Sequence, residues 1–213
     1  CLNDINNKDI QIIISADLNK KYLEFIIKYC KSIKLDKLKF IKINRENPIY
    51  FFENLIFTSR PSISFDYVFY NKFIGNKIFK KKIRNLYVKR GKTINKKVLN
   101  ENELIKFLQN YNYEIIDCLE MEIEEQIKVF SEAKNIIIPS GAAMANLLFV
   151  ADNINVVEIR SNLDGDFSKK INFNSRFYLY LFEETKKVGL KLRKDIIVNI
   201  LALKILIKEN KIF

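Results

Sequence analysis

The chain has 213 residues, of which 48% are hydrophobic, and it carries a formal net charge of +12. This length is enough for one large domain or two small ones with a real hydrophobic core. Because the chain has no histidine, catalysis of the Ser-His-Asp and Cys-His types is excluded, and so is a histidine–cysteine zinc cluster. The three cysteines, Cys1, Cys30 and Cys118, are widely spaced and favour reduced thiols in a cytosolic compartment.

The positive charge comes mostly from lysines scattered among asparagines and isoleucines, a composition that AT-rich codons favour. The denser cluster Lys77–Arg84 is typical of a solvated helix face, and the alternative is a patch for acidic polymers or lipid headgroups. Aromatic residues interleaved with lysines from Phe65 to Phe73 could stack single-stranded bases. No sheet-and-groove pattern accompanies them, so nucleic acid is not the expected partner. No apolar run reaches the ~18 residues of a membrane-spanning helix.

The first part of the chain predicts an α/β layer. Asp9–Ser15 is a near-continuous apolar run, typical of a parallel strand that is covered on both faces. An apolar stripe predicts a helix over Asn19–Ile33, and Lys39–Ile43 predicts a second strand. Pro48–Ser59 has the pattern of two short strands or one bent strand. We therefore expect a partial N-terminal α/β lobe at residues 1–60, followed by a connector at 61–85 with a helix over Asp66–Lys81.

Residues 86–213 predict a second, larger α/β lobe. We expect four segments to form one parallel sheet, namely Leu86–Arg90, Tyr113–Cys118, Ile136–Ser140 and Val156–Ile159. Helices are predicted from Asn100 to Asn110, with Asn100 and Glu103 as a capping box, and over Ile123–Ala133. After a polar turn at Asn162–Phe173, the pattern predicts a helix over Arg176–Gly189, a short strand at Leu190–Arg193 and a terminal helix over Asp195–Glu209.

A glycine turn stands at the centre of this second lobe. Strand Ile136–Ile138, turn Ser140-Gly141, helix Gly141–Phe149 and strand Asn155–Ile159 form a βαβ unit. The first backbone N–H groups of the helix have no intrahelical partner, and small side chains let an anion such as a diphosphate approach them. The alternative is that Gly141 and the alanines only allow tight packing of the helix on the strand.

The order of residues in this region resembles glycosyltransferase family 61. Members of that family carry a segment of roughly E-Q-x-x-x-F-x-x-A, then a strand, then H-G-A-x-x-x-N. The matching residues here are Glu125, Gln126, Phe130, Ala133, Gly141, Ala142 and Asn146. Ser140 stands where the family usually has histidine. Upstream, Arg90 matches an arginine of the family, Lys96-Lys97 stand for a basic pair that usually contains arginine, and Asn100–Leu104 matches N-E-x-E-L.

The resemblance implies a GT-B-like α/β fold with a Rossmann-like C-terminal lobe that binds a nucleotide-sugar. The expected donor is a UDP-sugar and the acceptor a glycan or polysaccharide, with inverting transfer and no required metal. The donor-binding residues it implies are Arg90, Lys97, Asn100, Ser140, Gly141, Ala142, Asn146 and Glu158, the last towards ribose hydroxyls or facing solvent. A bacterial, capsule-type enzyme of the cytoplasm with peripheral membrane contact fits this expectation. No residue is singled out as the catalytic base.

Other functions stay open at this point. The departures at Ser140 and Lys97 also fit a non-catalytic remnant or a basic anion- or nucleic-acid-binding module. A dehydrogenase lacks support, because no G-x-G-x-x-G follows an early strand. The acidic run from Glu120 to Glu125 and the Asp164–Asp166 turn could act as a base and a cation site, but they are more typical of a helix start and a turn. Because residue 1 is Cys, we expect a fragment of a longer product. Because the N-terminal lobe is only a partial β-α-β-β piece, we also expect that this chain does not turn over substrate by itself.

Overall fold

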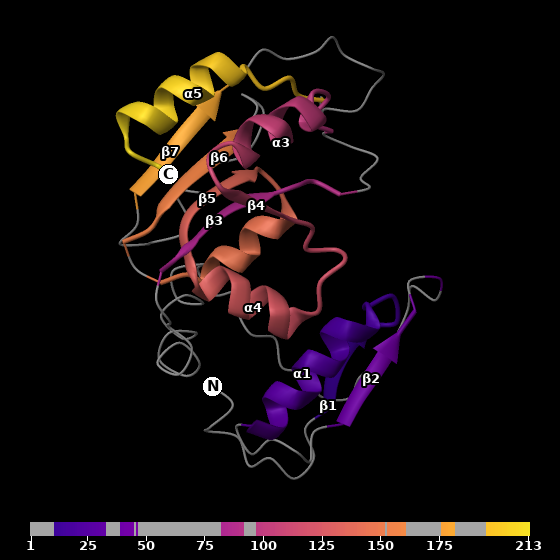
Figure 1. Ribbon diagram of the computed structural model, residues 1–213. Coiled ribbons are helices and arrows are strands. Elements are labelled where there is room, and N and C mark those ends of the chain that lie inside the picture. The colour runs from indigo at the N-terminus through magenta and orange to yellow at the C-terminus, as the bar shows by residue number, and fades with distance from the viewer. Residues whose placement is uncertain are drawn as a thin grey trace. The chain divides into compact units, whose positions relative to one another are not determined.

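A computed structural model describes residues 11–32, 39–44, 46, 82–91, 97–151, 153–160, 176–181 and 195–213. The chain divides into two compact units, Cys1–Ser59 and Arg60–Phe213 (Figure 1). The predicted segments Pro48–Ser59, Asp66–Lys81, Asn162–Phe173 and Leu190–Arg193 lie outside the described residues. The division into a lobe at 1–60, a connector and a second lobe stays a prediction.

The first unit contains a β-α-β arrangement. Strands β1 (Gln11–Ser15) and β2 (Lys39–Ile43) pair in parallel, and helix α1 (Lys20–Ser32) connects them. The predicted strands and helix of this region are thereby confirmed. A parallel pair needs such a crossover, and its isoleucine-rich strands suit burial on both faces.

The second unit is built on a five-stranded parallel sheet in the order β4-β3-β5-β6-β7. Its strands are β3 (Arg84–Val88), β4 (Tyr113–Ile116), β5 (Ala133–Pro139), β6 (Asn155–Arg160) and β7 (Arg176–Leu181). Every neighbouring pair runs in parallel, which confirms the predicted sheet of four segments. An α/β fold with parallel sheets agrees with a Rossmann-like lobe.

Strand β7 corrects one prediction, because Arg176–Leu181 was expected to begin a helix. The segment pairs with the whole of β6, from Asn155 opposite Arg176 to Arg160 opposite Leu181. Its sequence, RFYLYL, is rich in aromatic residues, which favour strands over helices when a partner strand is present. The helix prediction, which took Gly189 as the C-cap, could not include that partner.

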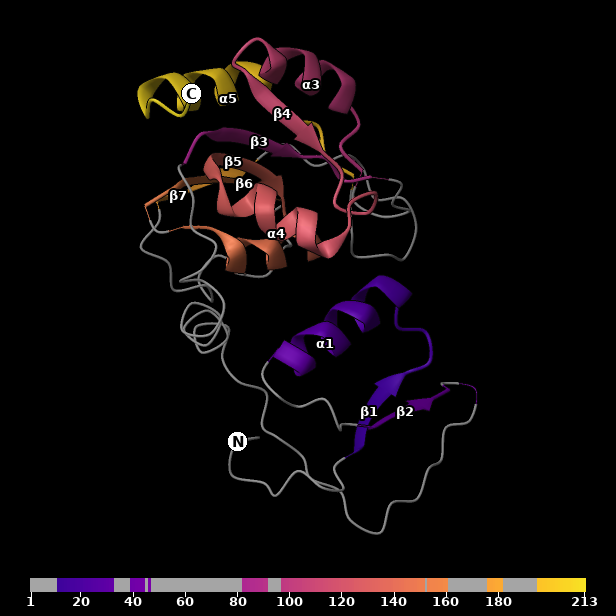
Figure 2. The same ribbon diagram turned by 60° about the horizontal axis from the view of Figure 1, so that its bottom comes forward.

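Helices cover both faces of this sheet (Figures 1 and 2). Helices α3 (Glu101–Gln109) and α5 (Ile200–Glu209) pack on one face, where Leu104, Leu108, Leu203 and Ile207 join the strands in one core. Helix α4 (Ile123–Ser131) and the 3₁₀ helix η3 (Ala142–Phe149) cover the other face with a second core. Burial on both faces explains why the strands are nearly continuous apolar runs.

Three helix starts differ from the sequence predictions. Helix α5 begins at Ile200 rather than Asp195, because Ile196 forms a parallel bridge with Val98 and Asn199 caps the helix. The predicted capping box is wrong, since Asn100 makes no cap bond with its side chain. That side chain instead binds both the N–H and the carbonyl of Val198 at 2.9 Å. The helix predicted from Gly141 is a 3₁₀ helix that starts at Ala142.

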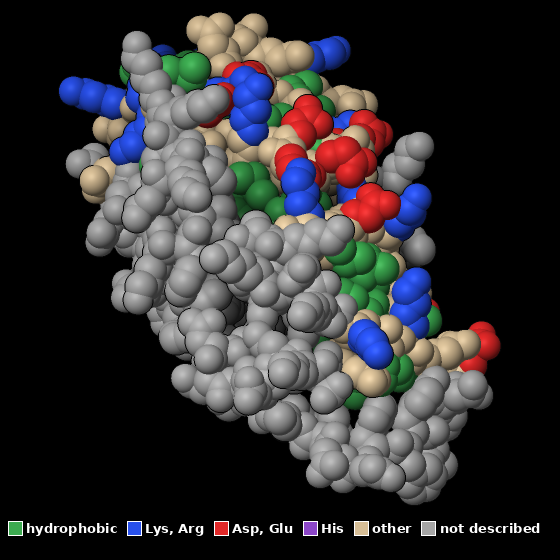
Figure 3. Space-filling view, turned by 90° about the horizontal axis from the view of Figure 1, so that it is seen from below, with side chains coloured by type: hydrophobic (Ala, Val, Ile, Leu, Met, Phe, Trp, Pro, Cys, Tyr) green, Lys and Arg blue, Asp and Glu red, His purple; other side chains and the backbone are tan. Residues whose placement is uncertain are grey.

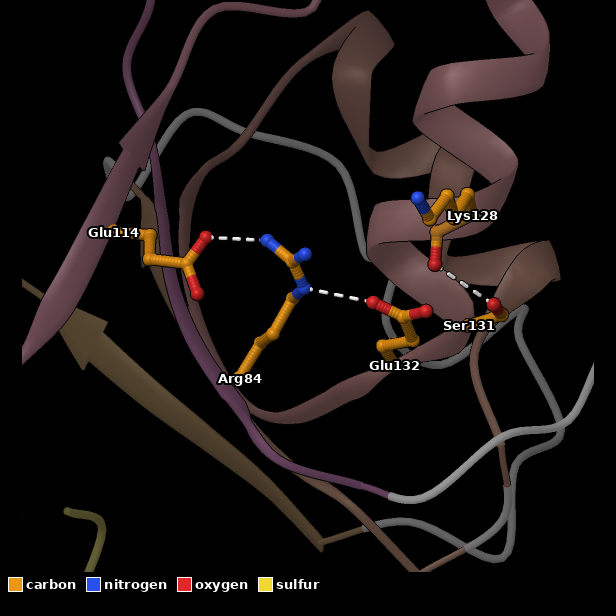
Figure 4. A network of polar contacts seen from close by, with 5 residues as sticks. All are labelled: Arg84, Glu114, Lys128, Ser131 and Glu132. Atoms are coloured by element: carbon orange, nitrogen blue, oxygen red, sulfur yellow. Dashed lines mark hydrogen bonds and ion pairs between the residues drawn. The ribbon is translucent and has the colours of Figure 1, made fainter.

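Polar side chains tie the strands together near their amino ends. Arg84 of β3 donates to Glu114 of β4 at 2.5 Å and to Glu132, just before β5, at 2.8 Å (Figure 4). Asn135 of β5 also links two strands: its amide donates to Asn85 of β3, and it accepts from Asn155 of β6. These bonds fix the register of the central strands at their amino ends, whereas the glycine turn lies at the carboxyl ends.

Candidate functional site

The strand order identifies where a ligand is expected to bind. In the sheet, β4 lies beside β3 on one side and β6 lies beside β5 on the opposite side. The connection that follows β3 and the connection that follows β5 therefore run in opposite directions along the sheet. In an open parallel sheet, the carboxyl ends of the two strands at such a reversal border a crevice that binds ligands. Here these ends are followed by Lys89-Arg90-Gly91 after β3 and Ser140-Gly141 after β5. Arg90, Ser140 and Gly141, all predicted from the sequence, therefore lie at the expected position.

Arg90 contacts the glycine turn directly. Its Nη1 donates a hydrogen bond to the carbonyl oxygen of Ser140. A Cβ added to Gly141 would lie 2.5 Å from the same nitrogen, which is closer than side chains ever approach. The φ of Gly141 is 164°, an extended conformation that any residue adopts. A side chain at position 141 would therefore displace the Arg90 guanidinium, whereas the backbone conformation itself does not require glycine.

The backbone of Arg90 is held by the first residue of α3. Its N–H donates to Glu101 Oε1 at 3.2 Å, and the hydroxyl of Tyr87 donates to the same oxygen at 2.8 Å. Burial raises the pKa of Tyr87, and the adjacent carboxylate of Glu101 raises it further. The phenol therefore stays protonated and keeps donating to Glu101. Sequence reasoning missed Glu101 and Tyr87, although Glu101 lies within the N-E-x-E-L match.

The start of η3 adds donors beside the guanidinium. The first bond of this helix runs from the Met144 N–H to the Gly141 carbonyl at 3.0 Å. No carbonyl of the helix lies far enough upstream to accept from the N–H groups before Met144, so these groups cannot be satisfied within the helix. Gly141 and Ala142 are exposed. A guanidinium and the positive end of a helix thus converge on one accessible turn, which is the arrangement that binds anions.

Basic and acidic side chains meet at this edge of the sheet. Lys89 and Arg90 follow β3, and Arg160 ends β6 at the same edge. Lys89 Nζ lies 3.5 Å from a carboxylate oxygen of Asp117, which offsets part of that charge. On the described part of the face in Figure 3, basic side chains lie among acidic ones and do not form a continuous basic patch there. Of the basic residues at this edge, Arg90 is the one whose guanidinium contacts the glycine turn.

Asn146 lies behind the turn rather than in it. Its Nδ2 donates to Gln126 Oε1 at 2.9 Å and to Cys118 Sγ at 3.4 Å. Gln126 in turn donates to the carbonyls of Cys118 and Met121. Both amides are buried. These bonds join η3, α4 and the segment after β4, so the two family-like residues fix the position of the helix behind the turn.

Glu158 is the most unusual side chain of the unit. It is fully buried, and among the described residues neither of its carboxylate oxygens has a hydrogen-bond partner. It stands opposite Ile138 of β5, and alternation along β6 places it on the face that α4 and η3 cover. The expectation that Glu158 might face solvent is wrong. A buried carboxylate without a partner costs several kcal/mol, so a ligand or water is expected to satisfy it.

Lys97 and Asn100 make other contacts. The backbone N–H of Lys97 donates to Asp195 Oδ1 at 2.8 Å, and its side chain is exposed. Asn100 binds the backbone of Val198 with both ends of its amide. In the described part of the chain, these contacts join α3 to the segment before α5. The assignment of both residues to a donor site stays a prediction.

Metal-ligand clusters and membrane-spanning helices were the two remaining features of interest among the described residues. No three His, Cys, Asp or Glu side chains among them gather as metal ligands do. None of the helices within the described ranges is both long and apolar enough to cross a membrane.

One comparison with known proteins gave a match. The model of the family Glycosyltransferase 61 matches residues 12–157, which is more than half of the chain. That range includes the arginine, the glycine turn and the Gln126–Asn146 pair. A search of curated proteins gave no match. Membership of the family suggests glycosyltransferase activity, with donor and acceptor substrates. The chain belongs to the glycosyltransferase 61 family.

Proposed function

We propose that the protein transfers a sugar from a nucleotide-sugar, a UDP-sugar, to a glycan or polysaccharide acceptor, with inversion and without a required metal. One observation carries this proposal: at the reversal of the strand order, Arg90 lies against Gly141 where η3 begins. A diphosphate is the part of such a donor that this combination of charge and backbone N–H groups fits best.

In this account Arg90 and the turn stabilise the leaving group. As the bond between sugar and diphosphate breaks, negative charge grows on the diphosphate. The guanidinium and the N–H groups of Gly141 and Ala142 stabilise that charge, because they are already oriented when the reaction begins. The carbonyl oxygen of Ser140 accepts a hydrogen bond from one of the five N–H groups of the Arg90 guanidinium. This bond orients Arg90 towards the turn.

Glu158 is proposed to bind the nucleoside. Ribose hydroxyls are neutral donors that would satisfy a buried carboxylate acceptor. Because Glu158 is fully buried, the nucleoside must displace whatever covers it. Asn146 and Gln126 would act by holding η3 in place, whereas Lys97 and Asn100 are assigned to the donor by the family resemblance alone. The two-lobe GT-B arrangement is likewise part of the proposal, with β1, α1 and β2 in the first lobe.

A thermal-shift measurement with UDP tests the proposal. UDP is expected to raise the melting temperature of the chain, and Arg90→Gln is expected to remove that shift, because glutamine carries no charge. Arg84→Gln is the matched control. Arg84 binds carboxylates at the opposite edge of the sheet, so its loss should lower the melting temperature but leave the shift with UDP intact. Equal shifts in the wild type and Arg90→Gln would place the nucleotide elsewhere.

Glycosyl transfer itself needs a separate assay. The chain is incubated with UDP-, GDP- and CMP-sugars and candidate acceptors, and the product is measured by mass spectrometry. Transfer that Arg90→Gln abolishes and Arg84→Gln preserves would establish the activity. Binding of UDP with no transfer to any acceptor agrees with the expected fragment as well as with the non-catalytic alternative, and transfer by a longer form of the protein would separate the two.

A further inference from the structure

Helix α5 has an apolar outer face in addition to the face that packs on the sheet. Leu203 and Ile207 point to the sheet and are fully buried. Leu201 and Ile205 lie on the opposite side and are 67% and 50% exposed. Because they are four residues apart on a helix, their side chains are neighbours. Helix α5 therefore carries large apolar side chains that are not part of the core.

The segment before α5 extends this apolar face. Ile197 and Leu99 are 46% and 53% exposed. Val98 and Ile196 form a parallel bridge and are buried, so the residues that follow them point outward. The Leu99 N–H donates to the Ile196 carbonyl at 2.8 Å, which brings Leu99 next to Ile197. We name Leu99, Ile197, Leu201 and Ile205 the α5 surface.

Exposed apolar side chains are concentrated here. The α5 surface contains half of the eight large hydrophobic residues that are exposed among the described residues. Single exposed apolar residues are ordinary, whereas a group that lies together marks an interaction surface. Helix α5 lies on the outside of the sheet in both views, on the side away from α4 (Figures 1 and 2).

Lysines border this surface. Lys204 and Lys208 are exposed, and each follows an apolar residue of the surface by three positions, which places it alongside on the helix. Lys97 is exposed two residues before Leu99. The exposed acidic neighbours are Glu209 at the other border of α5 and Glu103 in the first turn of α3. An apolar face edged by lysines is the pattern of helices that lie at a bilayer surface.

We propose that the α5 surface docks on an anionic lipid bilayer. The apolar side chains would enter the interface, while the lysines, with long aliphatic stems, would reach the anionic headgroups. A second copy of the chain fits less well. A two-fold pairing through this surface would place Lys204 and Lys208 of both copies close together, and like charges repel. The proposal goes beyond glycosyl transfer and does not depend on it.

Sedimentation with vesicles tests this proposal on the full 213-residue chain. Binding is expected to vesicles that contain phosphatidylglycerol, to be weak on pure phosphatidylcholine, and to fall as salt is raised. Lys204→Gln with Lys208→Gln is expected to weaken binding on the order of 30-fold, since each lysine near an anionic surface contributes about fivefold. Leu201→Gln with Ile205→Gln is expected to weaken it by roughly tenfold or more.

Matched controls use equally exposed residues elsewhere. Ile83→Gln with Leu119→Gln replaces apolar residues that are 61% and 63% exposed, and should leave binding unchanged. Lys28→Gln with Lys128→Gln removes the same charge from α1 and α4 and should have little effect. Absent binding, or equal loss in the controls, would overturn the proposal. So would light scattering that shows a dimer which Leu201→Gln with Ile205→Gln dissociates, since the surface would then belong to a second copy.

Discussion

Replacement of Gly141 by alanine separates a binding role of the glycine turn from a purely structural one. The new Cβ would lie 2.5 Å from Arg90 Nη1, so the guanidinium must move. The backbone need not move, because the φ of Gly141 is extended and suits alanine. The substitution therefore displaces Arg90 from the turn while the charge stays in the protein.

The size of the effect follows from the bond that is lost. A hydrogen bond from a charged donor contributes about 1.5–3 kcal/mol, and Arg90 is only partly buried, so we expect the free energy of unfolding to fall by about 1–1.5 kcal/mol. If the displaced guanidinium also loses its contact with the diphosphate, a similar loss of binding energy weakens UDP affinity about tenfold.

The assay pairs urea denaturation with calorimetric titration of UDP, and Arg84→Gln serves as the matched control. Arg84 binds Glu114 and Glu132 at the amino ends of the strands, away from the glycine turn. Arg84→Gln should thus lower stability by about 1 kcal/mol or more and leave UDP affinity unchanged. The reasoning is refuted if Gly141→Ala loses stability but binds UDP like the wild type.

Three more substitutions test the packing around the site. Arg84→Ala should lower the free energy of unfolding by about 2–3 kcal/mol in urea, because it leaves buried Glu132 without its ion pair, and an unchanged midpoint would contradict this. Asn135→Ala removes the amide that links Asn85 and Asn155 and should lower the free energy of unfolding by about 2 kcal/mol. Asn102→Ala on the exposed face of α3 should lower it far less. Glu158→Leu should raise the stability of the nucleotide-free protein by about 1 kcal/mol and weaken UDP binding, and a fall in stability would show that the carboxylate has a partner.

The parallel sheet could be predicted from the sequence because its strands are buried on both faces, whereas the strand order and its reversal are known only from the structure. Segments such as Ile136–Ile138 are continuous β-branched runs, and turns and helix patterns separate them. Strand ends also identified Arg90 and Gly141 as candidates. Their contact could not be predicted, because Arg90 and Ser140 are fifty residues apart and only the pairing of β3 with β5 brings them together.

Two of the wrong predictions share one physical cause, which is a partner distant in the sequence. Asn100 has the local pattern of a capping box, yet its amide binds Val198, ninety-eight residues away. Arg176–Leu181 was predicted to begin a helix that ends at Gly189, yet it completes the edge of the sheet beside β6. Local patterns do not encode such partners, and tertiary pairing outweighs helix propensity.

The most direct test of the central claim is a crystal structure of the chain with UDP bound. The account predicts the diphosphate at the carboxyl ends of β3 and β5, within hydrogen-bond reach of the Arg90 guanidinium and of a backbone N–H at the start of η3. The ribose should then point towards Glu158. A diphosphate bound away from Arg90 and the Gly141 turn would contradict the account.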